Sequence, residues 1–290
     1  MTRKRTAFGV MMFPTDDAMG VPQLAAAAEA RGFESLFLPE HTHIPVSRQS
    51  PYPGGGELPR EYLRTFDPLI ALSAAASVTE TIKLGTGIAL VTERDPILMA
   101  KQVASLDRLS GGRVLLGIGA GWNAEEMANH GVVYADRWKV LRERVLAMQA
   151  IWREEQAEFH GDFVDFDPIW SWPKPREASG PPILLGASSR YAFARIAEYA
   201  QGWMPIAPRP GRVGVDLREG MAALEREVTA RGRDFATIDC SVFGVGPDAE
   251  QIRELEDIGF GRIIFGLPPS GPDRIIPLLD RYADLAASLA

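Results

Sequence analysis

The chain has 290 residues, of which 46% are hydrophobic and 24% are charged. This length and composition support one large buried core, and they exclude a disulfide-stapled mini-protein and a disordered chain. The 31 basic and 38 acidic residues leave a net charge of −7. Because the basic excess typical of phosphate-backbone binding is missing, we expect no nucleic-acid partner. A single cysteine, Cys240, cannot form an internal disulfide and indicates a reducing compartment, so we expect a cytoplasmic protein.

The N-terminus superficially resembles a signal peptide, since a basic cluster at 3–5 precedes an apolar run at 8–13. The run is shorter than the roughly 7–15 residues of a signal-peptide core, and no cleavage-site pattern follows it. No apolar stretch approaches the roughly 18 residues of a membrane-spanning helix. We therefore expect no membrane partner.

Short β-type runs alternate with longer helical patterns along the chain, which is the order that produces a parallel sheet covered by helices. Strands are expected at Phe8–Met12, Ser35–Pro39, Lys83–Leu90, Val114–Ile118, Ile183–Gly186, Gly202–Ile206, Ile238–Gly244 and Arg262–Gly266. Helices are expected at Pro22–Arg31, Pro68–Thr79, Pro96–Leu109, Trp138–Trp152, Arg190–Tyr199, Val213–Arg231, Asp248–Ile258 and Pro272–Ser288.

Eight strand–helix units in roughly 250–300 residues is the count of a (β/α)₈ TIM barrel. A doubly wound open sheet has fewer strands and carries a cofactor fingerprint after the first one, which 13–20 lacks. We predict an α/β fold with one TIM-barrel domain over residues 1–290. Two Pro/Gly-rich segments, Ile44–Pro59 and Trp170–Pro182, are expected as loop insertions after strands 2 and 4.

Several helix ends carry their own signals. Asp67 and Asp95 each precede a proline and are expected to cap the following helix. Gly32 and the pair 111–112 follow predicted helices and suit the left-handed backbone of a helix C-terminus.

Active sites of TIM barrels lie at the carboxyl ends of the strands. The second strand ends there in Glu40 and His41, and His41 is the strongest candidate for catalysis because imidazole exchanges protons near neutral pH. The alternative is a loop histidine that only satisfies backbone groups. His43 is expected to line the entrance. His130, in a helix-end context, and His160, in a hairpin-like context, are interpreted as structural or solvated. No histidine pair has a carboxylate at metal-ligand spacing, so no metal site is predicted.

Glycines interrupt the third and fourth strands. Gly87 lies where a flat ring could rest against the backbone, with barrel curvature as the alternative reason. After the fourth strand, 117–123 reads G-x-G-x-G, which misses the dinucleotide pattern because Trp122 replaces the last glycine. The glycines of this segment, Gly117, Gly119 and Gly121, are expected to let a ligand approach the backbone, with Ala120 among the cofactor-binding residues. Trp122 is expected to offer an apolar surface and Asn123 a polar group that contacts the ligand. Trp122 could equally be core packing.

The fifth strand leads through Gly186 and Ala187 into a helix that begins near Ser188, Ser189 and Arg190. A serine there suits an N-cap, and the exposed amides of a helix N-terminus suit an anion. Capping alone explains the serines, so phosphate binding needs a further reason. Cys240 lies within a strand and is interpreted as buried and inert.

A set of motifs in order along the chain is more specific than any single one. It comprises LGTGI at 84–88, DPILMAKQ at 95–102, LDRLSGGR at 106–113, LGIGAGWN at 116–123, FHG at 159–161, PKP at 173–175, PPILLG at 181–186 and GWMP at 202–205. Together these segments resemble the bacterial luciferase-like monooxygenase superfamily over nearly the whole chain. Within the superfamily, the short chain and the sequence motifs at 106–113 and 121–123 are similar to those of the branch that uses the deazaflavin coenzyme F420.

The resemblance implies the same barrel, with an isoalloxazine-like ring over a bulge in the third strand and a cis peptide at Gly87-Ile88. It places Glu40 and His41 against the ring, and Ala187, Ser188 and Ser189 against the cofactor phosphate. The sugar-phosphate dehydrogenase of this superfamily has a glutamate where this chain has Trp122. That departure argues against the same proton-transfer scheme and the same substrate.

The leading hypothesis is hydride transfer between F420 and a small organic substrate. Phe13, His43 and Trp122 would shape the substrate side, and the insertion Ile44–Pro59 would close over it. Apolar and aromatic neighbours favour an uncharged substrate. One alternative is an FMN monooxygenase that uses reduced flavin and oxygen, with a separate flavin or deazaflavin reductase as partner. Another is a non-catalytic flavin-binding barrel. The resemblance also implies a homodimer.

Overall fold

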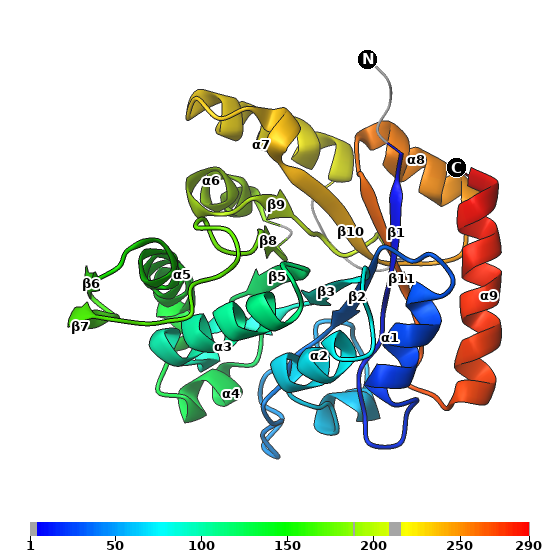
Figure 1. Cartoon of the computed structure of the whole chain (residues 1–290), viewed down its shortest axis with the longest axis horizontal. Helices are drawn as coiled ribbons and strands as arrows, with labels where there is room; N and C mark the ends of the chain where they lie inside the picture. Colours follow the sequence, from blue (N-terminus) through cyan, green and yellow to red (C-terminus); the bar gives the residue numbers. More distant parts are fainter. Residues whose placement is uncertain (1–4, 188, 209–215, 290) are drawn as a thin grey trace.

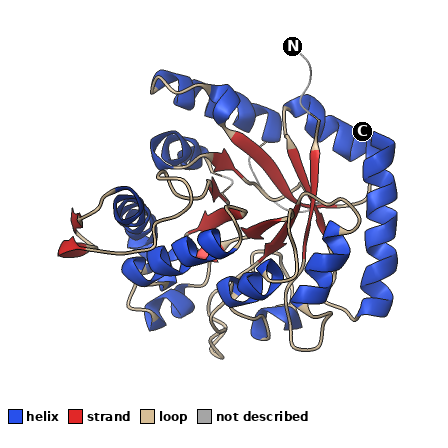
Figure 2. Cartoon of the chain, in the orientation of Figure 1, coloured by secondary structure: helices blue, strands red, loops and turns tan. Residues whose placement is uncertain are grey.

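The computed structural model describes residues 5–187, 189–208 and 216–289. Parallel strands close into a barrel, with the helices arranged around its outside (Figures 1 and 2). The strands run in the order β3-β2-β1-β11-β10-β9-β8-β5-β4, and the pairing of β3 with β5 completes the ring. The barrel strands are β1 (Ala7–Met11), β2 (Ser35–Leu38), β3 (Lys83–Thr86), β4 (Ala89–Leu90), β5 (Val114–Gly119), β8 (Ile183–Leu185), β9 (Gly202–Trp203), β10 (Asp239–Val245) and β11 (Arg262–Gly266).

β3 and β4 are two parts of one barrel strand, so the predicted eight-stranded (β/α)₈ barrel is confirmed. The predicted strand Lys83–Leu90 is interrupted between them, and the peptide bond Gly87-Ile88 that separates them is cis, as the resemblance implied. β9 stops at Trp203 rather than at Ile206, which keeps only an isolated bridge to Phe243.

The helices between barrel strands match the predicted ones within a few residues. They are α1 (Val21–Glu29), α2 (Pro68–Ala76), α3 (Pro96–Leu109), α5 (Arg137–Arg153), α6 (Arg190–Tyr199), α7 (Leu217–Ala230), α8 (Ala249–Ile258) and α9 (Pro272–Leu289). The predicted start of the seventh helix, at Val213, lies outside the described residues. Single turns of 3₁₀ helix occur at Arg60–Leu63, Val91–Glu93, Tyr134–Asp136 and Phe235–Thr237.

Two further elements lie outside the predicted strands and helices, and they confirm the helix-end context of His130 and the hairpin-like context of His160. α4 (Ala124–Asn129) follows β5, and an antiparallel hairpin of β6 (Ala157–His160) and β7 (Asp165–Ile169) follows α5. The hairpin projects beyond α5 at the edge of the molecule (Figure 1). Both insertions lie in the intervals expected: Ile44–Pro59 follows β2, and Trp170–Pro182 follows the hairpin on the way to β8.

The predicted helix ends are confirmed. The carboxylate of Asp67 accepts from the backbone N–H of Leu69 at 2.9 Å, and that of Asp95 accepts from Leu98 N–H at 2.8 Å. Gly32 has φ of 78°, a left-handed conformation that costs glycine little. These local signals fix where each helix meets its loop.

The barrel interior is packed by Met11, Phe37, Leu115, Leu184, Met204 and Ile264. A larger apolar layer lies between the strands and the surrounding helices. Cys240 is buried there, and burial raises the pKa of its thiol to about 12, which keeps it protonated. No helix in the described part of the chain has both the length and the apolarity to cross a membrane.

Candidate functional site

The carboxyl ends of the barrel strands surround a partly apolar floor. Phe13, Ile88 and Phe243 are partly buried there and pack on the barrel interior. A Cβ added to Gly119 would lie 2.0 Å from Cδ1 of Ile88, and one added to Gly186 would lie 2.6 Å from its Cγ2. These two glycines therefore make room for the Ile88 side chain, a reason for glycine that differs from the ligand approach expected from the sequence.

Glu40, at the end of β2, is only 3% exposed, and its charge is balanced by Arg94. Arg94 donates through Nε to Oε1 of Glu40 at 2.7 Å, and a second nitrogen, Nη2, contacts the same oxygen. Oε2 of Glu40 accepts from the backbone N–H of Leu90 at 2.6 Å. Arg94 also reaches Asp67 at 2.5 Å, so the Glu40 carboxylate connects β2, β4 and the start of α2.

His41 is oriented by a carboxylate from a different part of the chain. Its Nδ1 lies 2.7 Å from Oε2 of Glu126, whose side chain is fully buried. Oε1 of Glu126 also accepts from the backbone N–H of Thr42 at 3.0 Å. Since a carboxylate only accepts, Nδ1 of His41 donates this hydrogen bond, and the other ring nitrogen, Nε2, does not face Glu126.

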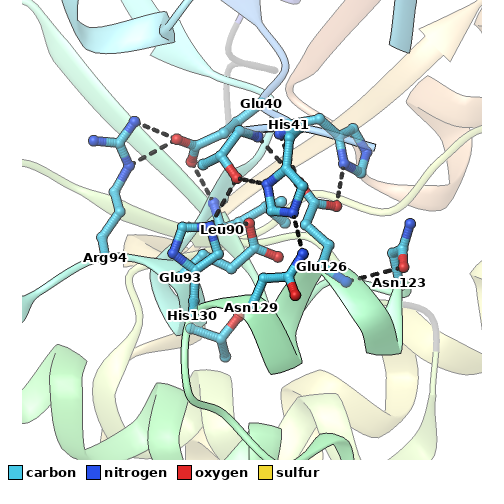
Figure 3. A network of polar contacts seen from close by, with 12 residues as sticks. Glu40, His41, Leu90, Glu93, Arg94, Asn123, Glu126, Asn129 and His130 are labelled. Carbon is cyan, nitrogen blue, oxygen red and sulfur yellow. Dashed lines mark hydrogen bonds and ion pairs between the residues drawn. The ribbon is translucent and has the colours of Figure 1, made fainter. Parts of the chain in front are cut away.

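A second buried acid, Glu93, lies beside this pair (Figure 3). Its side chain is only 1% exposed. Burial, with added repulsion from Glu126 and Glu40, raises the pKa of Glu93 to about 9. These surroundings favour the neutral form of the Glu93 carboxyl group.

Polar contacts continue from Glu93 toward the surface. Nε2 of His130 lies 3.9 Å from Oε2 of Glu93 and 2.8 Å from the hydroxyl of Thr42. The same hydroxyl lies 2.9 Å from Nδ1 of His43, and Nε2 of His43 lies 2.8 Å from the Asn129 amide nitrogen (Figure 3). His130, interpreted from sequence as structural or solvated, thus belongs to the polar network of the site.

Aromatic rings form a wall above the floor. Tyr62 lies between Phe13 and His41, with ring centroids 4.7 Å and 5.1 Å away. Trp122 lies 5.8 Å from His41 and 6.1 Å from Tyr52. The wall therefore combines three residues predicted for the site with two tyrosines that sequence reasoning had not singled out.

The insertion Ile44–Pro59 is held against this wall by Glu125, in the first turn of α4. The Glu125 carboxylate accepts from the hydroxyl of Ser47 at 3.1 Å, from Gln49 N–H at 2.7 Å and from Ser50 N–H at 3.1 Å. The hydrogen bond from the Ser50 hydroxyl is the largest cause that lowers the pKa of Glu125 to about 2. The loop is therefore tied to an ionised carboxylate.

The remaining predicted residues occupy the ends of β5 and β8. Asn123 is 1% exposed, and its Oδ1 accepts from Glu126 N–H at 3.2 Å. Its Nδ2 is buried and, among the described residues, has no hydrogen-bond partner. Ala120 is buried beside it, and Gly121 has φ of 76°.

Ser189 occupies the N-cap position of α6, but its side chain makes no capping hydrogen bond within the described residues. The Ala187 carbonyl accepts from the indole N–H of Trp203 at 2.9 Å. Ser188 and the side chain of Arg190 lie outside what the structure describes.

A cleft of about 420 Å³ lies beside the network, between the start of α3 and the β6–β7 hairpin. Glu93, Arg94 and His130 line one side, and Arg144 and Phe166 line another. The residues of the aromatic wall do not line this cleft. We therefore regard the barrel mouth as the candidate active site and the cleft as a separate space that borders it.

Comparisons with known proteins agree with this arrangement. A family model described as luciferase-like monooxygenase matches residues 7–255. An uncharacterized protein of Mycobacterium tuberculosis is 39% identical over 286 residues, covering 98% of each chain. The chain therefore belongs to the luciferase-like monooxygenase family, a family of oxidoreductases.

More distant relatives have named activities. The 5,10-methylenetetrahydromethanopterin reductase of Methanolobus tindarius is 24% identical over 264 residues, covering 90% of this chain and 72% of the relative. The FMNH₂-dependent dimethylsulfone monooxygenase of Pseudomonas putida is 34% identical over 122 residues, covering 41% of this chain and 33% of the relative.

Among solved structures, an F420-dependent secondary alcohol dehydrogenase in complex with an F420–acetone adduct has a TM-score of 0.80 at 17% identity, covering 99% of both chains. The F420-dependent tetrahydromethanopterin reductase of Methanopyrus kandleri has a TM-score of 0.75 at 18% identity, covering 98% of this chain and 99% of the other. At these identities the likeness shows the shared fold.

Proposed function

We propose that the protein is an F420-dependent oxidoreductase that transfers a hydride between the deazaflavin and a small organic substrate. The observation that carries the proposal is the orientation of His41 by Glu126 at the barrel mouth, beside the floor formed by Phe13, Ile88 and Phe243. The F420-dependent structural neighbours support the choice of cofactor, and the reductase relative, whose match covers 90% of this chain, supports an oxidoreductase activity.

The residues at the mouth fit a flat heteroaromatic ring. Ile88 and Phe243 offer apolar surface, and the unpartnered Nδ2 of buried Asn123 offers a hydrogen-bond donor. A buried donor without a partner costs free energy, so a ring carbonyl or an ordered water would be expected to satisfy it. When bound, the deazaflavin supplies hydride transfer at its C5 carbon.

His41 is the proposed acid–base residue. With Nδ1–H donated to Glu126, Nε2 can accept a proton from a substrate hydroxyl, and it can return that proton in the reverse direction. Glu126 would stabilise the imidazolium that forms. Glu40 is not proposed as an acid–base residue, because both of its carboxylate oxygens already accept hydrogen bonds, one from Arg94 and the other from the backbone N–H of Leu90.

The aromatic wall would orient the substrate and exclude water. Tyr62 and Trp122 border His41, and the insertion carries Tyr52 over the same region. The residues that follow β8, Gly186, Ala187, Ser188 and Ser189, are proposed to hold the cofactor phosphate at the start of α6. The uncapped Ser189 side chain is consistent with that role.

The experiment is a turnover screen with purified full-length protein and F420, following the deazaflavin absorbance with enones, imines, nitro compounds and alcohols. We expect His41→Ala to lose about 100-fold or more in kcat with any substrate found. His160→Ala is the matched control, because His160 is exposed on the β6–β7 hairpin. A His41→Ala protein with unchanged kcat would overturn the proposed role.

An FMN monooxygenase is the second candidate. The partial match to the FMNH₂-dependent monooxygenase of Pseudomonas putida favours it. In that case a separate reductase would supply the reduced flavin, and FMN would bind in place of F420.

A further inference from the structure

Arg48, in the insertion Ile44–Pro59, lies over the aromatic wall. Its guanidinium carbon is 5.9 Å from the centroid of the Trp122 ring. Its Nη1 atom is buried and has no hydrogen-bond partner among the described residues. A buried charged donor without a partner is unfavourable, because it has lost water and gained nothing in exchange.

The backbone around Arg48 is held in place on both sides of the residue. Arg48 has φ of 50°, a left-handed conformation that is uncommon for residues other than glycine. The Glu125 carboxylate accepts hydrogen bonds from Ser47 on one side and from Gln49 and Ser50 on the other. The loop is therefore anchored immediately before and after Arg48.

Neighbouring arginines differ from Arg48 in having acidic partners. Arg60 lies 3.1 Å from Asp17, and Arg64 lies 2.5 Å from Asp16. Within the described part of the chain, no carboxylate forms an ion pair with Arg48. The charge at the aromatic wall is thus available for a ligand.

We propose that Arg48 binds the carboxylate of an anionic organic substrate held against Trp122 at the barrel mouth. This inference rests on the proposed function and names its substrate class. A carboxylate substrate replaces the uncharged one that was expected from the apolar and aromatic residues alone. The reducible or oxidisable carbon of the substrate would then lie near His41, whose ring is 5.8 Å from Trp122.

The anionic tail of a cofactor is the other anion that an arginine could bind. Its proposed phosphate position, at the start of α6, follows β8, whereas Arg48 follows β2. β3 and β5 separate those two strands in the barrel. The substrate carboxylate is therefore the assignment we make, and the test separates the two.

The test compares benzoate with its neutral analogue benzamide by isothermal titration of the full chain loaded with F420. We expect wild-type protein to prefer benzoate by about tenfold or more, the amount typical of a charge-assisted hydrogen bond. Arg48→Gln should abolish that preference without changing F420 affinity, and Arg48→Lys should retain part of it. Arg60→Gln removes a neighbouring positive charge and should leave the preference intact.

Two results would overturn the assignment. One is equal affinity of wild-type protein for benzoate and benzamide. The other is a loss of F420 affinity in Arg48→Gln with the benzoate preference unchanged, which would assign Arg48 to the cofactor tail. If F420 does not bind, the proposed function fails separately. The benzoate comparison is then made with FMN-loaded or cofactor-free protein and still decides the role of Arg48.

Discussion

Nδ1 of His41 and Oε2 of Glu126 lie 2.7 Å apart, although 85 residues separate them in the chain. The barrel brings them together, because the segments that follow β2 and β5 both lie at its carboxyl end. The pair fixes one nitrogen of the imidazole as donor and leaves the other for chemistry.

Glu126→Gln should therefore reduce kcat with F420 by about 100-fold, since an amide cannot stabilise the imidazolium as a carboxylate does. KM should change little, because Glu126 is buried behind His41. Glu125→Gln, at the neighbouring residue, is the control. It should raise mainly KM, because it weakens the hydrogen bonds that hold the loop at 47–50. Steady-state kinetics of both variants distinguish the role of Glu126 from that of Glu125. Equal kcat in Glu126→Gln and wild type would contradict the proposed role of Glu126.

The raised pKa of Glu93 should make the free energy of unfolding depend on pH. Its pKa is about 9 in the folded chain, against an ordinary value of 4.5. Between these values the unfolded chain releases this proton while the folded chain keeps it, so the free energy of unfolding falls as pH rises. Glu93→Gln mimics the neutral acid and removes that slope.

Thermal denaturation from pH 5 to pH 9 checks the Glu93 prediction. The wild-type Tm should fall relative to that of Glu93→Gln, and at the alkaline end the variant should be more stable by about 2–4 °C or more. Parallel Tm curves for the two proteins would show that Glu93 is not held neutral.

The features that sequence reasoning predicted are local or strongly periodic. Asp67 and Asp95 cap their helices as expected, because a cap depends on residues two or three positions away. The strand–helix alternation likewise predicted the barrel. The short α4 and the β6–β7 hairpin were anticipated only through the helix-end context of His130 and the hairpin-like context of His160. The bounds of α4 were not predicted, since six residues show too little periodicity to distinguish a helix from a loop.

The polar partners in the site could not be predicted in the same way. Glu126, Arg94 and His130 reach Glu40, His41 and Thr42 only through the fold, across 54 to 88 residues of chain. A glutamate in a predicted loop carries no sign that it will be buried. The one available signal for Glu126 was its place just after the fourth strand, at the same end of the barrel as His41.

Arg94 should be essential for stability because it balances the buried carboxylate of Glu40. Arg94→Met leaves that charge without its partner and should cost about 3–5 kcal/mol of unfolding free energy. Arg142→Met is the matched control, since the ion pair of Arg142 with Glu198 is exposed and should contribute about 0–1 kcal/mol. Urea denaturation measures both, and similar losses in the two variants would refute the distinction.

Gly117 should not tolerate even alanine. A Cβ there would lie 2.0 Å from the backbone oxygen of Thr86, which the barrel holds in place. Gly117→Ala should therefore cost about 3 kcal/mol, at the upper end of ordinary overpacking. Gly246→Ala adds the same methyl group where nothing lies within 4 Å and should be near neutral. Comparable denaturation midpoints for the two variants would contradict the packing of β3 against β5.

The cofactor preference of the protein decides the proposed function, and it is measured by equilibrium titration of the purified, cofactor-free chain with F420 and with FMN in parallel. We expect saturable micromolar binding of F420 and weaker binding of FMN. Ile88→Asp, in the floor of the barrel mouth, should lose much of the F420 affinity. Micromolar binding of FMN with no binding of F420 would contradict the proposed function and favour the flavin monooxygenase instead.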